Sequence, residues 1–183
     1  MLDVAREKAV QSRAAPTLVN ADARSFSLGR KFGMIFFPNN SLGHLHTLDD
    51  IRSCFSCVRE HLTEGGLFII DFFNPSLALL MRDPATRYPV ASYFDNRRKY
   101  TVVTETVRYD ASAQISYAIW HYEREGEPEE VRLLDIRMYF PQELDGLLTM
   151  NGFTVDAKYG DFAGTAFCSE SRQQVIVCIR STV

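Results

Sequence analysis

The sequence predicts an α/β fold in which helices pack on a mainly parallel sheet and an antiparallel insert precedes the last helix. Two apolar runs, residues 34–37 and 67–71, lack polar alternation, which is typical of strands covered on both faces. An amphipathic helical pattern at residues 47–63 separates them, and residues 92–138 alternate with a period of two. Apolar strands joined by amphipathic helices favour a sheet with helices on both faces.

The N-terminal segment is expected to begin with a helix over residues 2–13, because good helix formers place Leu2, Ala5 and Ala9 on one face. No residue that could cap the start of this helix precedes it in the sequence. A short strand is expected next at residues 17–20, followed by a loop that leads to the first apolar run.

The helix between the two apolar strands has the clearest local signals. Thr47 and Asp50 match a capping box at its start, and Gly65 and Gly66 are expected to end it. Its apolar positions recur at helical spacing: Ile51, Phe55, Val58 and Leu62. A short helix over residues 77–82 is expected after the second strand.

The alternating segments at residues 92–138 are separated by polar turns, and they predict an antiparallel meander of about three strands. Pro141 then starts another helix, which Gly152 is expected to end. Residues 153–160 and 173–180 have the composition of two closing strands.

Length and composition indicate one domain of 183 residues with an ordinary globular core. We divide it into a partial core (1–91), an antiparallel insert (92–140) and the C-terminal part of the core (141–183). The net charge of −3 offers no basic surface for nucleic acid. No apolar run approaches the ~18–20 residues of a membrane-spanning helix, and no signal-peptide pattern opens the chain. We therefore expect neither nucleic acid nor a membrane as a partner.

The four cysteines do not form a disulfide framework, which favours a cytoplasmic location. Cys54 and Cys57 lie three residues apart on the predicted helix and are best interpreted as small buried side chains. Neither this pair nor His44 with His46 has the three or four converging ligands that a zinc site needs, so no metal is expected.

Polar residues follow each predicted strand of the first half: Asp22, then Asn39 to Ser41, then Asn74. In open α/β sheets, ligands bind where the carboxyl ends of the strands meet loops. These residues therefore predict the rim of a binding crevice. The alternative is that they are ordinary turn formers, a common role for Asn, Asp and Ser.

Four stretches together resemble the class I S-adenosylmethionine-dependent methyltransferases, most closely the small-molecule, amino-sugar N-methyltransferase type. They are "MLDVAREKA", "LVNADARSFSLGRKFGMIFFPNNSLGHL", "DDIRSCFSCVREHLTEGGLFIIDFFNP" and "MYFPQELDGLLTMNGF". The resemblance implies a Rossmann-like methyltransferase sheet with strand order 3-2-1-4-5-7-6, S-adenosylmethionine as the cofactor and a small-molecule methyl acceptor.

The resemblance also implies roles for individual residues. Met1 would lie near the adenine, Asp22 would accept a hydrogen bond from the adenine amino group, and the Ala23 N–H would reach the ring. The loop after the fourth strand of the family fold would line the methionine portion and the acceptor pocket: Phe37, Pro38, Asn39 and Asn40. A plain Asx turn is the alternative role for Asp22.

The glycine-rich turn of such enzymes has no counterpart, because none of the ten glycines forms G-x-G. We expect a chain truncated at its N-terminus relative to the family by on the order of 40 residues, slightly more than one βαβ unit. The edge of the strand at residues 34–37 would then be bare, and a homodimer is the expected remedy. The segment at 17–20 could instead pair with that edge, or further residues could precede Met1. Cofactor binding by this chain alone is expected to be weak or absent.

Methyl transfer is an in-line displacement that needs alignment more than a strong acid or base. An amine acceptor must be neutral to attack, so His44 or His46 could take its proton. Both could instead be structural histidines near a helix start. Arg137, Tyr139 and Tyr159 could bind the acceptor, and cross-strand packing or a salt bridge is the alternative for each.

The sequence therefore predicts a cytoplasmic S-adenosylmethionine-dependent methyltransferase for a small molecule, incomplete in this chain. The alternative is a non-catalytic remnant or dimerisation module of the same fold. A third hypothesis is an α/β domain that binds another nucleoside-like ligand.

Overall fold

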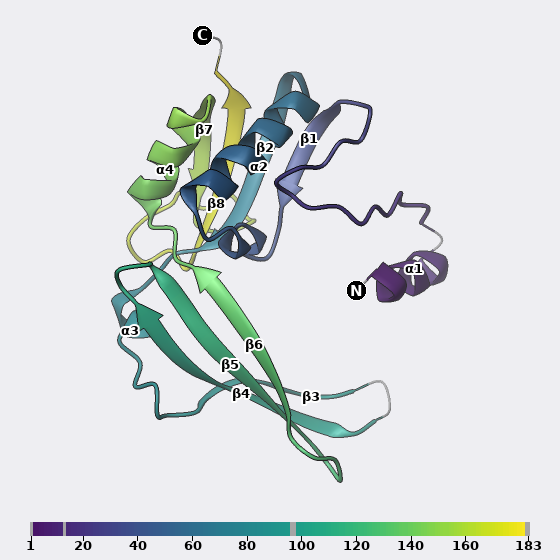
Figure 1. Ribbon diagram of the computed structural model, residues 1–183, viewed down its shortest axis with the longest axis vertical. Helices are drawn as coiled ribbons and strands as arrows, with labels where there is room; N and C mark the ends of the chain where they lie inside the picture. Colours follow the sequence, from purple (N-terminus) through teal and green to yellow (C-terminus); the bar gives the residue numbers. More distant parts are fainter. Residues whose placement is uncertain (1, 13, 96–97, 182–183) are drawn as a thin grey trace.

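A computed structural model describes residues 2–12, 14–95 and 98–181, and it contains two four-stranded sheets (Figure 1). The core sheet has the order β1-β2-β8-β7. Its strands are β1 (Phe32–Phe37), β2 (Leu62–Phe73), β8 (Gln173–Arg180) and β7 (Phe153–Tyr159). β1 and β2 are parallel, whereas β8 is antiparallel to both of its neighbours. This order matches the 4-5-7-6 half of the sheet that the resemblance implies.

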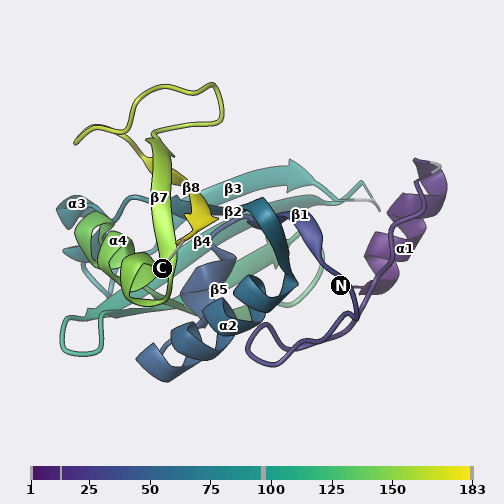
Figure 2. The ribbon, with the colours of Figure 1, turned by 90° about the horizontal axis from the view of Figure 1, so that it is seen from above.

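Two helices cover one face of the core sheet, α2 (Leu48–His61) and α4 (Pro141–Met150) (Figure 2). The predicted capping box at the start of α2 is confirmed, since Thr47 Oγ1 accepts from the Asp50 N–H at 3.0 Å. Under these helices Phe55, Phe68 and Phe153 are fully buried, with ring centroids 5.2 to 5.7 Å apart. Gly152 ends α4 with a φ of +80°, as predicted.

The opposite face of the core sheet is not covered by a described helix, so the prediction of helices on both faces is wrong for this part of the chain. On that face Met34 is 55% exposed and Phe36 is 42% exposed. The loop at residues 160–172 lies there, and Phe162 meets Phe36 edge-on with ring centroids 6.3 Å apart. The strand at 34–37 is therefore buried on one face only.

The expected strand at residues 17–20 does not form. A strand needs a neighbour for its N–H and C=O groups, and among the described residues β1 pairs with β2 alone. Val19 is consequently 51% exposed. The first helix does form, as α1 (Leu2–Gln11), but it has no buried residue and lies apart from both sheets (Figure 1).

The glycine pair after α2 has a different role from the predicted one. The helix ends at His61 because Leu62 is already extended, with φ −85° and ψ 139°, and β2 begins there. Gly65, with φ +68°, lies in the irregular first part of β2, where residues 63–66 oppose Gly33 alone on β1. The predicted strand at 67–71 is the regular middle of this longer strand.

The insert is an antiparallel sheet of four strands in sequence order, one more than the sequence predicts. They are β3 (Tyr88–Phe94), β4 (Tyr100–Asp110), β5 (Ile115–Arg124) and β6 (Glu130–Arg137). The sheet extends from the end of the core sheet where β1 and β2 finish (Figure 1). A short helix, α3 (Leu77–Leu80), and a 3-10 turn, η1 (Ser41–His44), lie at this junction.

None of the described helices combines the length and the apolar character that a membrane crossing requires.

Candidate functional site

The polar loop after β1 is held in shape by the end of β2. Asn39 and Asn40 have φ values of +51° and +59°, in the left-handed region that asparagine tolerates better than most residues. The Asn39 N–H donates to Asp71 Oδ2 at 3.0 Å, and the Asn40 N–H donates to the Asp71 carbonyl at 3.1 Å. Asn40 Oδ1 in turn accepts from the Phe73 N–H at 2.7 Å. The asparagines thus set the path of the loop that lines the site.

A hollow of about 510 Å³ lies on one side of this loop. It is lined by Asp22, Ala23, Arg24, Phe36, Phe37, Pro38, Ser41, His44 and Leu45. We call it the cofactor-side hollow. A second, more apolar hollow of about 380 Å³ adjoins it along the open edge of β1 and shares Asp22, Ala23 and Phe37. Of the residues predicted to face the cofactor, the structure brings together Asp22, Ala23, Phe37 and Pro38 in the cofactor-side hollow, whereas Asn39 and Asn40 do not line it.

The Asp22 carboxylate is held by Arg24. Its Oδ1 accepts from the Arg24 N–H at 2.8 Å, which is an Asx turn, and its Oδ2 accepts from the guanidinium at 2.7 Å. The same guanidinium reaches Asp50 Oδ1 at 2.8 Å. Hydrogen bonds from the side chain and the backbone of Arg24 lower the pKa of Asp22 to about 2. Arg24 Nε also donates to both oxygens, at 3.0 and 3.2 Å. Three N–H groups of Arg24 therefore occupy most of the roughly four acceptor sites of the carboxylate. Its side chain is still half-exposed, so a ligand amino group could reach it by replacing part of the guanidinium contact.

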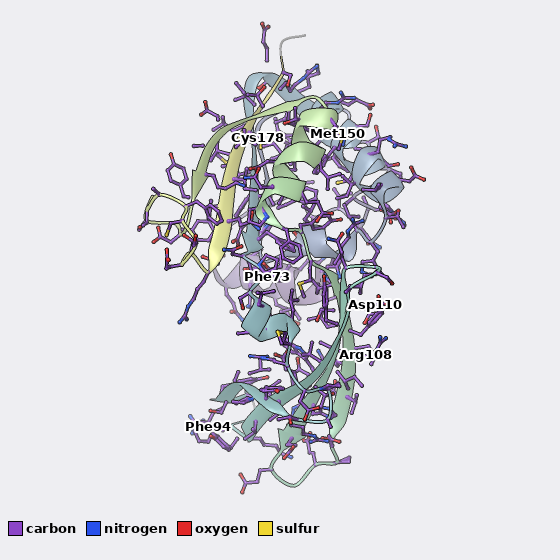
Figure 3. All side chains as sticks on the ribbon, turned by 90° about the vertical axis from the view of Figure 1, so that its left-hand side faces the viewer. Phe73, Phe94, Arg108, Asp110, Met150 and Cys178 are labelled. Atoms are coloured by element: carbon purple, nitrogen blue, oxygen red, sulfur yellow. The ribbon has the colours of Figure 1, made fainter. Side chains whose placement is uncertain are left out.

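A further hollow of about 300 Å³ lies between the other side of the loop and the insert sheet. Its walls are mainly apolar. It is lined by Asn39, Asn40, His44, Phe73, Leu79, Glu105, Val107, Ser116, Ala118, Trp120, Leu134, Ile136 and Met138. We call it the acceptor-side hollow. Phe73 marks the junction between the two sheets in Figure 3.

His44 lines both the cofactor-side and the acceptor-side hollow. It ends η1, which the left-handed Asn40 precedes. His46 lines neither hollow: its Nε2 lies 3.1 Å from the Asp135 carbonyl, and its own carbonyl accepts from Arg137 Nη1 at 2.9 Å. Of the two predicted histidines, the structure brings only His44 to the place where the hollows meet.

The three residues predicted to bind the acceptor do not line the acceptor-side hollow. Arg137 is buried and pairs with Glu143 at 2.9 Å. Tyr139 is fully buried, its hydroxyl donates to the Leu45 carbonyl, and burial raises its pKa. Tyr159 lies beside Phe162 on the open face of the core sheet. Met1 lies outside the described residues.

Two residues that sequence reasoning missed, Glu105 and Trp120, line the acceptor-side hollow from β4 and β5. They are cross-strand partners, and Trp120 Nε1 donates to Glu105 Oε2 at 3.1 Å. Arg82 Nη1 donates to the other oxygen, Oε1, at 2.7 Å. The alternating pattern places each residue on one face of its strand, but only the register of the two strands makes them neighbours. No cluster of three or more potential metal ligands occurs in the part of the chain that the structure describes.

The fold of the chain is similar to that of solved methyltransferase structures. No family model matches the chain. The CcbJ methyltransferase from Streptomyces caelestis superposes with a TM-score of 0.82 at 26% identity, covering 99% of this chain and 71% of CcbJ. A S-adenosylmethionine-dependent methyltransferase from Clostridium acetobutylicum gives a TM-score of 0.80 at 18% identity, with 98% and 71% covered. DesVI from Streptomyces venezuelae gives 0.74 at 18% identity, with 98% and 70% covered.

One curated relative matches over a shorter segment. It is the dTDP-3-amino-3,4,6-trideoxy-alpha-D-glucopyranose N,N-dimethyltransferase of Streptomyces venezuelae, 34% identical over 55 residues. That segment is 30% of this chain and 23% of the length of the relative.

Proposed function

Because the chain has the fold of the class I S-adenosylmethionine-dependent methyltransferases and resembles their sugar N-methyltransferase members, we propose that it methylates a small-molecule amine. The observation that carries this proposal is the position of His44 between two hollows. One hollow contains the residues that would face the cofactor, and the other is formed with the insert sheet. S-adenosylmethionine supplies an activated methyl group on its sulfonium. The acceptor then belongs in the acceptor-side hollow.

The residues of the cofactor-side hollow fit a nucleoside. An adenine edge needs one hydrogen-bond acceptor and one donor, and the Asp22 carboxylate followed by the Ala23 N–H supplies both. Phe37 and Pro38 add apolar walls, and the volume of about 510 Å³ is in the usual range for small-molecule sites. Asn39 and Asn40, pinned by β2, support the shape of the wall between the two hollows.

His44 is the residue we propose to take the proton of the acceptor amine. An amine attacks only in its neutral form, and imidazole changes its charge near neutral pH. His44 is exposed and lines the acceptor-side hollow, so it can reach a ligand there. His46 has less support for this role, since its ring contacts the backbone of β6.

Binding of S-adenosylhomocysteine tests the cofactor site directly. We expect weak binding by this chain, in the millimolar range by isothermal titration calorimetry. Asp22→Ala should weaken it about tenfold, the effect of removing a hydrogen-bonded charge. Asp49→Ala is the matched control, because Asp49 is a carboxylate 86% exposed on α2, outside the hollow. Absence of heat at millimolar ligand would instead favour the non-catalytic alternative.

Turnover tests the role of His44. With tritiated S-adenosylmethionine and an amine acceptor, His44→Gln should lower kcat by about a hundredfold or more, the usual contribution of a general base. An unchanged kcat in the variant would remove His44 from the mechanism.

We further propose that two copies of the chain associate through the open edge of β1. Unpaired backbone groups on an apolar edge strand favour pairing with another chain, and Met34 and Phe36 next to this edge are exposed. Met34→Lys should therefore shift the protein toward monomer in analytical ultracentrifugation. Met150→Lys is the control, since Met150 is 76% exposed on α4. A wild-type monomer at high concentration would contradict the proposal.

A cytoplasmic location is part of the same proposal. Cys54, Cys57, Cys168 and Cys178 are all free thiols, which agrees with a reducing compartment. Neither nucleic acid nor a membrane is proposed as a partner, given the net charge of −3.

A further inference from the structure

We propose that Glu105 selects the acceptor by accepting a hydrogen bond from a hydroxyl group at the end of the acceptor remote from His44. This inference rests on the proposed function in one respect, that the acceptor occupies the acceptor-side hollow. It assigns a specificity-determining role to a carboxylate on the insert sheet. The acceptor it predicts is an amine with a second hydrogen-bond donor, and a purely apolar amine would be disfavoured.

The register of the insert sheet separates Glu105 from His44 along the hollow. η1 packs on β6 at the level of Ile136, since a Cβ built on Gly43 would lie 2.6 Å from the Ile136 side chain. Ile136 is opposite Ser116 on β5, whereas Glu105 is opposite Trp120, four residues further along β5. At about 3.3 Å per residue this is roughly 13 Å along the strand. Glu105 and His44 therefore lie at opposite ends of the acceptor-side hollow.

Glu105 is held in one orientation by two donors, one on the neighbouring strand β5 and one in the loop between α3 and β3. On one side Trp120 Nε1 donates to Oε2 at 3.1 Å. On the other side Arg82, whose guanidinium lies 4.5 Å from the Tyr88 ring centroid, donates to Oε1 at 2.7 Å. Tyr88 is itself the β3 partner of Glu105. A carboxylate positioned in this way loses little conformational entropy when it binds a ligand. Its fixed orientation favours ligands that place a donor at the matching position.

The carboxylate also has capacity left for a ligand. An ionised carboxylate offers about four acceptor sites, and Arg82 and Trp120 use one on each oxygen. The Glu105 side chain is only 17% exposed, and the walls beside it are the apolar Val107 and Ala118. Charge-assisted hydrogen bonds are strong in such a partly desolvated place. A ligand with no hydrogen-bond donor at this end would remove water from the carboxylate without replacing the hydrogen bonds that the water makes.

Trp120 allows a direct test, because it is the only tryptophan of the chain and lines the hollow. Its fluorescence reports binding without cofactor or turnover. The two probes are D-glucosamine and cyclohexylamine, six-membered ring amines that differ in the hydroxyl donors. We expect the wild type to bind glucosamine about tenfold more tightly than cyclohexylamine, and Glu105→Gln to lose most of that preference.

Glu123→Gln is the matched control, since Glu123 lies on the same sheet, pairs with Arg87 at 3.0 Å and is 55% exposed. It should keep the wild-type preference. Thermal melts by circular dichroism establish that both variants are folded, and Glu105→Asp, which retains the charge, should restore part of the preference. An equal preference in wild type and Glu105→Gln overturns the proposal, as does a lack of any fluorescence change with either probe. Selective binding without any methyl transfer would leave the role of Glu105 intact and refute the proposed function instead.

Discussion

Replacing Tyr139 with phenylalanine removes one oxygen atom from the centre of the junction between the two sheets. The Tyr139 side chain is fully buried, and its hydroxyl donates to the Leu45 carbonyl in the segment that follows η1. The ring should stay in place, packed edge-on against Phe72 at 5.7 Å between centroids. The variant therefore isolates the hydrogen bond from the packing of the aromatic ring.

The expected cost is a loss of about 1–3 kcal/mol in the free energy of unfolding. This is the range for removing one partner of a buried hydrogen bond, because the Leu45 carbonyl then remains buried without this donor. The full loss of the side chain, in Tyr139→Ala, would add a cavity and mix the two effects. With an m value of roughly 2 kcal/mol/M in urea, the unfolding midpoint should fall by about 0.5–1.5 M.

Urea unfolding followed by circular dichroism measures this loss, and Tyr100→Phe is the control because Tyr100 is 44% exposed. The same variants are then titrated with glucosamine through Trp120 fluorescence. We expect Tyr139→Phe to bind the probe within about twofold of the wild type, since the residue does not line the acceptor-side hollow. Unchanged stability together with weakened binding would refute the structural interpretation and restore the acceptor-binding role predicted from sequence.

Other expectations follow from the same contacts. Thr47→Ala removes the capping box of α2 and should cost about 0.5–2 kcal/mol by urea unfolding; no loss would show that the cap is dispensable. Hydrogen bonds from Arg24, then Thr47, lower the pKa of Asp50 to about 2. Its contribution to stability is therefore present above pH 4 and disappears as the pH falls from 4 toward 2. Arg24→Met should lose less in thermal melts over that interval, and an identical decline would contradict the pairing. In alkylation followed by mass spectrometry, the exposed Cys168 should react first, whereas Cys54, whose pKa burial raises to about 12, should react only after unfolding; early labelling of Cys54 would contradict its burial.

Local sequence signals determined most of the secondary structure. The Thr47 capping box, the spacing of apolar residues in α2 and the Gly152 stop signal each act within a few residues, so each could be read from the sequence. The alternation of the insert strands is equally local, although it predicted about three strands where the sheet has four. The segment at 17–20 was mispredicted, because its strand propensity requires a neighbour that the described chain does not supply.

The candidate site was only partly accessible to sequence reasoning. The sequence with its family resemblance pointed to Asp22, Ala23, Pro38 and His44, which line one hollow. Pro38 and His44 follow β1, whose end lies at the edge of the sheet where ligands bind in such folds. Asp22 and Ala23 follow a segment that forms no strand, so the family resemblance, and not the sheet, pointed to them. What only the tertiary structure decided is the acceptor side, including the pairing of Glu105 with Trp120 and the burial of Tyr139. The physical reason is that cross-strand register and docking of the insert depend on contacts between residues distant in the chain, which no local pattern specifies.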